Sequence, residues 1–233
     1  MNEDEAKIAE QLLNNPSIQR IAGFQNGRNS FYNYFPILKA ELYILGCFRT
    51  NFPKLYAEYR RVIGTLRANH PSLRQNFSNS VYPSITFNLG PKTICFLHRD
   101  AKNLAYGICA VTSLGSYDHR KGGHLVLWEL KLILEFPPGA TILIPSAAIS
   151  HCNTSIQEGE TRYSITQYCA GGLMRWVSYG CRSAATLKET DRGKDFLARF
   201  EKGNQDRCER FVGLFSKHGE LAEDIRCLCH QNN

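Results

Sequence analysis

A histidine and an aspartate stand two residues apart in HRDAKN, residues 98–103, directly after an apolar run. In an extended strand, residues i and i+2 point to the same face, so His98 and Asp100 would lie side by side. A second histidine, His151, ends a later apolar run, PPGATILIPSAAIS, which is expected to form one strand leading into it. Two histidines and one carboxylate on neighbouring strands are the ligands of non-haem Fe(II) oxygenases. The pattern predicts a metal site, although each residue alone more often has a structural role.

Arg162 lies eleven residues after His151 and opens the run RYSITQY, with Ser164 two residues further on. A guanidinium binds a carboxylate through two parallel N–H groups, and a hydroxyl on the same face adds a hydrogen bond. Together with the three candidate ligands, this arrangement fits a clamp for the distal carboxylate of 2-oxoglutarate. A zinc hydrolase with the same ligands would not need the arginine. The alternative for Arg162 is an ion pair with an acidic side chain at the surface.

A sheet must carry these residues, and the sequence predicts one. From about residue 81, short runs rich in β-branched and aromatic residues alternate with turn signals, which favours an antiparallel sandwich or jelly roll. Apolar residues at helical spacing predict helices over 3–14, 37–48 and 53–68, and helices again from 186. The β-rich runs are SITFNL, TICFL, AYGICAVTSL, GHLVLWEL, LILEF, ATILIPS and YSITQY.

Several of these segments resemble the double-stranded β-helix core of TET/JBP-type dioxygenases, which oxidise methylated bases in nucleic acid. The resemblance spans roughly residues 80–175. It implies that His98, Asp100 and His151 bind Fe(II), and that Arg162 and Ser164 hold 2-oxoglutarate, with O₂ as the other co-substrate. The matching segments are HRDAKN, GGHLVLWEL, PPGATILIPS, ISHCN and RYSITQY.

The resemblance, combined with the predicted helices, implies an α+β fold with a jelly-roll core flanked by N- and C-terminal helices. We expect one dioxygenase domain over residues 1–233, with a helical part at 1–79, the catalytic core at 80–180 and helices at 181–233. The group that holds the second carboxylate of 2-oxoglutarate has no clear match. Asn88 and Lys92 are the candidates.

The resemblance also implies three residues at the target base. Asn103 would read the base edge and Tyr168 would stack on the flipped base, whose extraction costs a few kcal/mol. Asn103 would then serve the base and not the iron. TET enzymes point a histidine at the cytosine ring where this chain has Ala170. We therefore expect oxidation of 5-methylcytosine to 5-hydroxymethylcytosine and further, with relaxed selectivity that includes N6-methyladenine demethylation. The alternative for Tyr168 is a core aromatic on the sheet.

The formal charge of +7 is concentrated in residues 51–121, which carry ten basic and three acidic side chains. A localised basic surface is typical of a polyanion partner, here DNA with a methylated base. Arg60 and Arg61 are the candidate phosphate contacts, and the alternative is a solvated basic face without a partner. No apolar stretch reaches the ~20 residues of a membrane helix, so no membrane association is expected.

Nine cysteines without a secretory signal indicate a reducing compartment, and we expect a nuclear protein. Cys208, His218, Cys227 and Cys229 have poor spacing for a zinc site, so zinc is not expected. Ascorbate is expected to stimulate turnover, and no obligate protein partner is inferred. Two alternatives stay open: an oxygenase acting on RNA or protein side chains, and a non-catalytic DNA-binding jelly roll.

Overall fold

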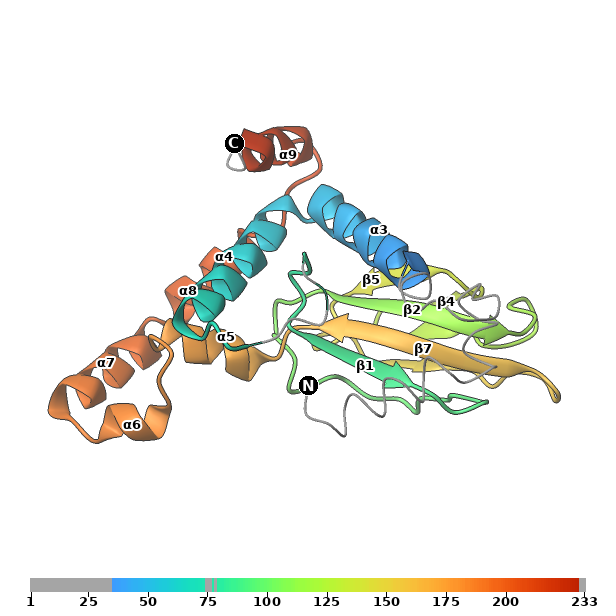
Figure 1. Ribbon diagram of the computed structural model, residues 1–233, viewed down its shortest axis with the longest axis horizontal. Helices are drawn as coiled ribbons and strands as arrows, with labels where there is room; N and C mark the ends of the chain where they lie inside the picture. Colours follow the sequence, from blue (N-terminus) through green and yellow to red (C-terminus); the bar gives the residue numbers. More distant parts are fainter. Residues whose placement is uncertain (1–34, 74–76, 78, 231–233) are drawn as a thin grey trace.

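The computed structural model describes residues 35–73, 77 and 79–230 (Figure 1). The helix expected at 3–14 lies outside these residues. The next two predicted helices are confirmed as α3, Phe35–Asn51, and α4, Pro53–Asn69. They are separate because Pro53 disfavours a helical conformation at the residue before it and suits the first turn of a new helix. No helix among the described residues is long and apolar enough to cross a membrane.

The described strands form two antiparallel sheets, and the chain alternates between them. The larger sheet has the order β1-β7-β2-β5, and the smaller one has the order β4-β3-β6. The chain leaves the larger sheet after β2 and again after β5, and it returns at β5 and β7. This is the double-stranded β-helix that the sequence led us to expect. The strands are β1 Ser84–Asn88, β2 Cys109–Ser116, β3 Leu125–Leu127, β4 Leu132–Leu134, β5 Thr141–Ile144, β6 His151–Asn153 and β7 Thr161–Tyr168.

The run TICFL, residues 93–97, was expected to be a strand, and that prediction is wrong. The segment runs beside β6, but side chains take the place of ladder partners. The N–H of Cys95 donates to the side-chain oxygen of Asn153 at 2.8 Å, and the carbonyl of Phe96 accepts from Nδ1 of His98 at 2.7 Å. The backbone of β6 is joined to this segment by one bond from the N–H of Asn153 to the carbonyl of Cys95, and then at His98, whose backbone exchanges two hydrogen bonds with that of His151.

The single strand expected to lead into His151 is also wrong, because Pro145 ends β5. The carbonyl of Pro145 accepts from the N–H groups of Ala148 and Ile149, which closes a turn. Proline cannot donate to a ladder, so a strand seldom continues through it. The turn moves the chain from the larger sheet to the smaller one and begins β6 at His151.

Two apolar cores hold the helices and the two sheets together. The larger core joins α3, α4 and α5 to the chain around β2 and the end of β7, and it contains the packed rings of Phe48, Tyr59 and Tyr82. The smaller core joins β3 and β5 and contains Leu127 and Ile144. The helices and the larger sheet therefore share one core, and the sandwich has its own.

Helices return after the sheet, and one of them was not predicted. Helix α5, Gly171–Ser178, begins directly after β7 with two glycines, which hide its helical pattern in the sequence. Met174 and Val177 are buried in the larger core and stabilise α5. In Figure 1 the α6–α7 pair lies farthest from the sheets. The predicted C-terminal helices are confirmed as α6 Ala184–Lys188, α7 Asp191–Lys202, α8 Asn204–Val212 and α9 Leu221–His230.

Candidate metal and co-substrate site

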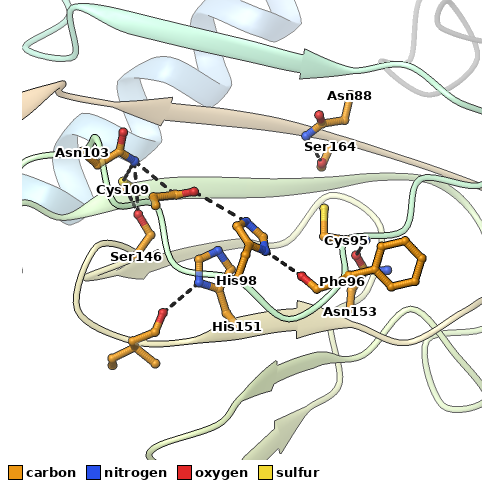
Figure 2. Close-up of polar contacts among 12 residues, drawn as sticks. Asn88, Cys95, Phe96, His98, Asn103, Cys109, Ser146, His151, Asn153 and Ser164 are labelled. Atoms are coloured by element: carbon orange, nitrogen blue, oxygen red, sulfur yellow. Dashed lines mark hydrogen bonds and ion pairs between the residues drawn. The ribbon is translucent and has the colours of Figure 1, made fainter.

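His98, Asp100 and His151 come together where β6 begins, and Figure 2 shows the two histidine rings side by side. One ligand atom from each residue lies within 4.8 Å of the others, and no other such group of three is found among the described residues. His151 belongs to β6, His98 is joined to it by backbone pairing, and Asp100 follows in a turn. The sequence prediction that these three residues meet is therefore matched by the geometry.

Both imidazole rings are oriented by backbone carbonyls. Nδ1 of His98 donates to the carbonyl of Phe96 at 2.7 Å, and Nδ1 of His151 donates to the carbonyl of Ile149 at 2.9 Å. A proton on Nδ1 leaves the lone pair of Nε2 for a metal, and such partners fix the ring of a ligating histidine. His151 is buried, whereas the His98 side chain is 43% exposed, so the group is open on one side. These residues fit a divalent metal.

Asp100 is held by two further contacts. Its N–H donates to the carbonyl of Ser146 at 3.0 Å, and its Oδ2 accepts from the side-chain amide of Asn103 at 3.0 Å. The other oxygen, Oδ1, lies 3.5 Å from Nε2 of His98. Asn103 therefore contacts a candidate metal ligand, a contact that the sequence did not reveal. Its role at a target base stays a prediction.

A buried thiol and a hydroxyl lie next to Asn103 (Figure 2). Sγ of Cys109 is 2.8 Å from Oγ of Ser146, and the Asn103 amide is within 3.4 Å of both atoms. Burial raises the pKa of Cys109 to about 11, so the thiol is neutral at physiological pH. Cys109 thus supports Asn103 as an uncharged partner. Sequence reasoning missed this pair because Cys109 and Ser146 are 37 residues apart and only the fold brings them together.

Arg162 is almost fully buried, with 3% of its surface exposed, on the inner face of β7. Its Nη1 donates to the carbonyl of Thr93 at 3.2 Å, while its Nε has no hydrogen-bond partner. None of the ion pairs among the described residues includes Arg162, which argues against the surface pair considered above. A buried guanidinium with an unmatched N–H fits an anionic ligand, because leaving such a donor unpaired is costly.

Gly115 allows β2 to lie close to β7 at Arg162. Gly115 is paired with Arg162 across the β2–β7 ladder and has a φ of +125°, a conformation that favours glycine. A Cβ built at Gly115 would lie 2.2 Å from the carbonyl oxygen of Thr161. Any side chain at this position would push the two strands apart and displace Arg162.

Asn88 and Ser164 form a polar pair on the same face of the larger sheet as Arg162, since alternate residues of a strand share a face. They are opposite one another in the β1–β7 ladder, and Nδ2 of Asn88 donates to Oγ of Ser164 at 2.9 Å. Lys92 is also adjacent to Arg162 through its backbone, but it is exposed. Asn88 is therefore better placed than Lys92 to reach a ligand inside the sandwich.

The other candidate base contacts lie at the end of β7. Tyr168 is the last residue of β7 and is partly buried, on the same face as Ser164. Ala170 caps α5 in an extended conformation and forms an isolated backbone bridge with Asn103. Ala170 and Asn103 are thus neighbours. Their contact with a base stays a prediction, as does that of Tyr168.

The basic segment 51–121 is partly neutralised by ion pairs. Arg61 on α4 binds Glu58 through two contacts of 2.9 Å, and Glu58 also accepts from Arg210 of α8. The hydrogen bonds that Arg61 donates to Glu58 raise the pKa of Arg61. Arg60 is exposed on the same helix. Paired cations of this segment are Lys54 with Asp224, Arg61 with Glu58, Arg99 with Glu129, and Arg120 and Lys121 with Asp118.

The four C-terminal residues weighed as zinc ligands are all described, and they are not part of the one ligand group found. Instead, Cys227 donates to Glu223 within α9, and Cys229 accepts from Arg49 of α3 at 3.0 Å. The first contact lies within α9, and the second joins α9 to α3.

No protein-family model matches the chain, and a search of curated proteins found no match. Similar solved structures include NgTET1 in complex with 5mC DNA, with 18% identity and a TM-score of 0.43 over 70% of this chain and 55% of that chain. They also include a viral collagen prolyl hydroxylase from Paramecium Bursaria Chlorella virus-1 in a 2OG complex, with 12% identity and a TM-score of 0.35 over 71% of this chain and 88% of that one. This chain thus spans about half the length of the NgTET1 chain. The likeness concerns the fold, and the chemistry of the site rests on its own residues.

Proposed function

We propose that the protein is an Fe(II)- and 2-oxoglutarate-dependent dioxygenase that oxidises the methyl group of a methylated DNA base. The observation that carries this proposal is a combination of two features of the sandwich. His98 and His151 each keep Nε2 for a metal and form a ligand group with Asp100, and Arg162 on β7 is a buried cation that has an unmatched N–H. A metal site alone fits many reactions, whereas a metal site with an internal carboxylate clamp fits an oxygenase that consumes 2-oxoglutarate.

Each part of the site has a definite task. His98, Asp100 and His151 would hold the metal, which would bind the co-substrate and O₂ and supply the oxidation. Arg162 binds the distal carboxylate of 2-oxoglutarate, and the hydroxyl of Ser164 adds a hydrogen bond. Asn88, already bonded to Ser164, is the candidate for the second carboxylate. The bound metal and 2-oxoglutarate together supply oxidative decarboxylation to succinate and CO₂, with one oxygen atom passing to the substrate.

The substrate is the part of the proposal that rests on the resemblance and on charge. A methyl carbon inside a duplex cannot reach the interior of the sandwich, so the base must be flipped out. Tyr168 offers a π-face for stacking, and the exposed Arg60 offers a phosphate contact. On 5-methylcytosine the product is 5-hydroxymethylcytosine, and on N6-methyladenine it is a hemiaminal that loses formaldehyde. We also propose that the protein is nuclear and that ascorbate stimulates its turnover.

Succinate release tests the proposal and separates it from its alternatives. We expect succinate to form with Fe(II) and 2-oxoglutarate, and to form faster with methylated than with unmethylated DNA. Faster release with RNA or protein and not with DNA would identify the other oxygenase class. DNA binding without succinate release under any condition would identify a non-catalytic module. Asp100→Ala is the control, because it removes a metal ligand without removing the DNA-facing surface.

A further inference from the structure

Glu129 lies at the corner of the β3–β4 hairpin, and its carboxylate accepts three hydrogen bonds. Nη2 of Arg99 donates to Oε1 at 2.5 Å. The hydroxyl of Ser150 donates to the same oxygen at 2.7 Å, and the N–H of Ser150 donates to Oε2 at 2.7 Å. Arg99 and Ser150 are also joined directly, because Nε of Arg99 donates to Oγ of Ser150 at 2.8 Å. The three side chains form a closed triangle.

The position of this triangle in the chain gives it a consequence for the metal site. Arg99 stands between His98 and Asp100, and Ser150 directly precedes His151. Glu129 comes from a third segment and therefore ties together both segments that carry the candidate metal ligands. The hairpin is anchored to the same place, since the N–H of Trp128 donates to the carbonyl of Ser150 at 2.9 Å.

The segment that carries His98 and Asp100 is not fixed by regular structure, and His151 follows a turn. Residues 93–97 lack a strand ladder, and residues 145–150 form the turn that leads into β6 at His151. Few backbone hydrogen bonds join the two segments near the ligands: His98 pairs with His151, and the N–H of Asp100 donates to the carbonyl of Ser146. The separation of Asp100 from His151 thus also depends on side-chain contacts. The hydrogen bond from the Ser150 hydroxyl is the largest cause that lowers the pKa of Glu129 to about 2, so the carboxylate is ionised at physiological pH.

We propose that Glu129 is a positioning residue for the metal centre, which holds the Asp100 turn and the His151 segment at the separation that a bound metal requires. This inference rests on the proposed metal site. Partners that orient ligands from outside the coordination shell commonly change metal affinity by about 10–100-fold when they are removed. The contacts of Glu129 are partly exposed, so their main effect is on geometry and not on the stability of the fold.

Metal binding of the full chain tests the proposal without turnover. Mn²⁺, a redox-stable probe for this site, is titrated and the free ion is followed by electron paramagnetic resonance. We expect Glu129→Ala to weaken Mn²⁺ binding about tenfold or more. Glu135→Ala is the matched control, because Glu135 belongs to the same region and binds His119 at 3.0 Å, away from both ligand segments. It should change the affinity by less than about twofold.

Two further variants separate positioning from folding. Ser150→Ala removes only the hydroxyl and should also weaken Mn²⁺ binding. In the double variant with Glu129→Ala, the loss of Mn²⁺ binding free energy should be smaller than the sum of the losses in the two single variants. Glu129→Gln keeps one acceptor oxygen and should restore part of the affinity. Unchanged Mn²⁺ binding in folded Glu129→Ala and in Ser150→Ala, beside its loss in His98→Ala, would overturn the proposal. Unchanged binding in His98→Ala would overturn the metal site itself, and with it this role of Glu129. Loss of Mn²⁺ binding in Glu129→Ala would support the positioning role. If the natural protein released no succinate at the same time, the positioning role would stand and the proposed activity would be rejected.

Discussion

The side-chain amide of Asn103 donates a hydrogen bond to Oδ2 of Asp100 at 3.0 Å. The resemblance had implied that Asn103 serves the base and not the iron. The observed bond makes Asn103 a partner of a metal ligand, and it leaves Oδ1 of Asp100 on the side of His98. The carboxylate therefore has one oxygen for the metal and one for the protein.

Asn103→Ala is consequently expected to lower two rates. Without the amide, Oδ2 of Asp100 loses a donor and the carboxylate can turn, so uncoupled 2-oxoglutarate turnover should fall about 10-fold or more along with base oxidation. The measurement is succinate release with and without methylated DNA. Tyr168→Ala is the comparison, since a stacking residue should lower only the DNA-stimulated rate. Uncoupled turnover that is unchanged in Asn103→Ala would return Asn103 to a role at the base alone.

Arg162→Ala should act on the co-substrate. Loss of a charged hydrogen-bonding partner costs about 1.5–3 kcal/mol, so the 2-oxoglutarate concentration for half-maximal rate should rise by about 10–100-fold. Because Arg162 is buried, folding must be checked by thermal melting. In the natural protein 2-oxoglutarate should raise the melting temperature by mass action, and in the variant it should not. An equal thermal shift in a folded variant would show that the clamp lies elsewhere.

Much of this site was predictable from the sequence, because alternate residues of a strand point to the same face. His98, Asp100, His151 and Arg162 were placed by spacing and by the resemblance, and the structure brings the first three together and buries the fourth. Strand boundaries near the site were not predictable. The apolar run at 93–97 fits a strand, but Asn153 and His98 take its backbone groups with their side chains.

Contacts between distant residues account for the other differences. Arg99 pairs with the distant Glu129 and Arg61 pairs with Glu58 on its own helix, so the net charge of residues 51–121 overstates the number of unpaired basic side chains there. Helix α5 was missed because its first two residues are glycines, whereas its stability comes from burial of Met174 and Val177. A single sequence contains no local signal for the Arg99–Glu129 pair or for the burial that stabilises α5.

Ala170→His should change which base is oxidised. Ala170 has a φ of −73° and is partly exposed, so a larger side chain is compatible with its backbone and surroundings. A histidine would offer the cytosine ring a hydrogen bond worth about 1–3 kcal/mol in a dry site. We expect the ratio of 5-methylcytosine to N6-methyladenine oxidation to rise. If the natural protein oxidises 5-methylcytosine strongly and N6-methyladenine not at all, then Ala170 does not set selectivity.

Charge reversal on α4 should distinguish the contributions of two neighbouring arginines to DNA binding. Arg60 is exposed, whereas the charge of Arg61 is matched by Glu58. Arg60→Glu should therefore weaken DNA binding more than Arg61→Glu, equally for all sequences, because phosphate contacts carry no base information. Binding measured across a salt series should weaken steeply for the natural protein and less steeply for Arg60→Glu. Affinity that does not depend on salt would exclude this surface from DNA binding.

The central claim is tested most directly by mass spectrometry of the nucleosides recovered after incubation of methylated DNA with the protein, Fe(II), 2-oxoglutarate and ascorbate. We predict 5-hydroxymethylcytosine from 5-methylcytosine, and adenine from N6-methyladenine, with succinate formed alongside. Omission of 2-oxoglutarate, or the variant Asp100→Ala, should abolish both products while the variant stays folded. Unchanged nucleosides in the presence of active succinate release would contradict the DNA substrate, and full activity of Asp100→Ala would contradict the metal site.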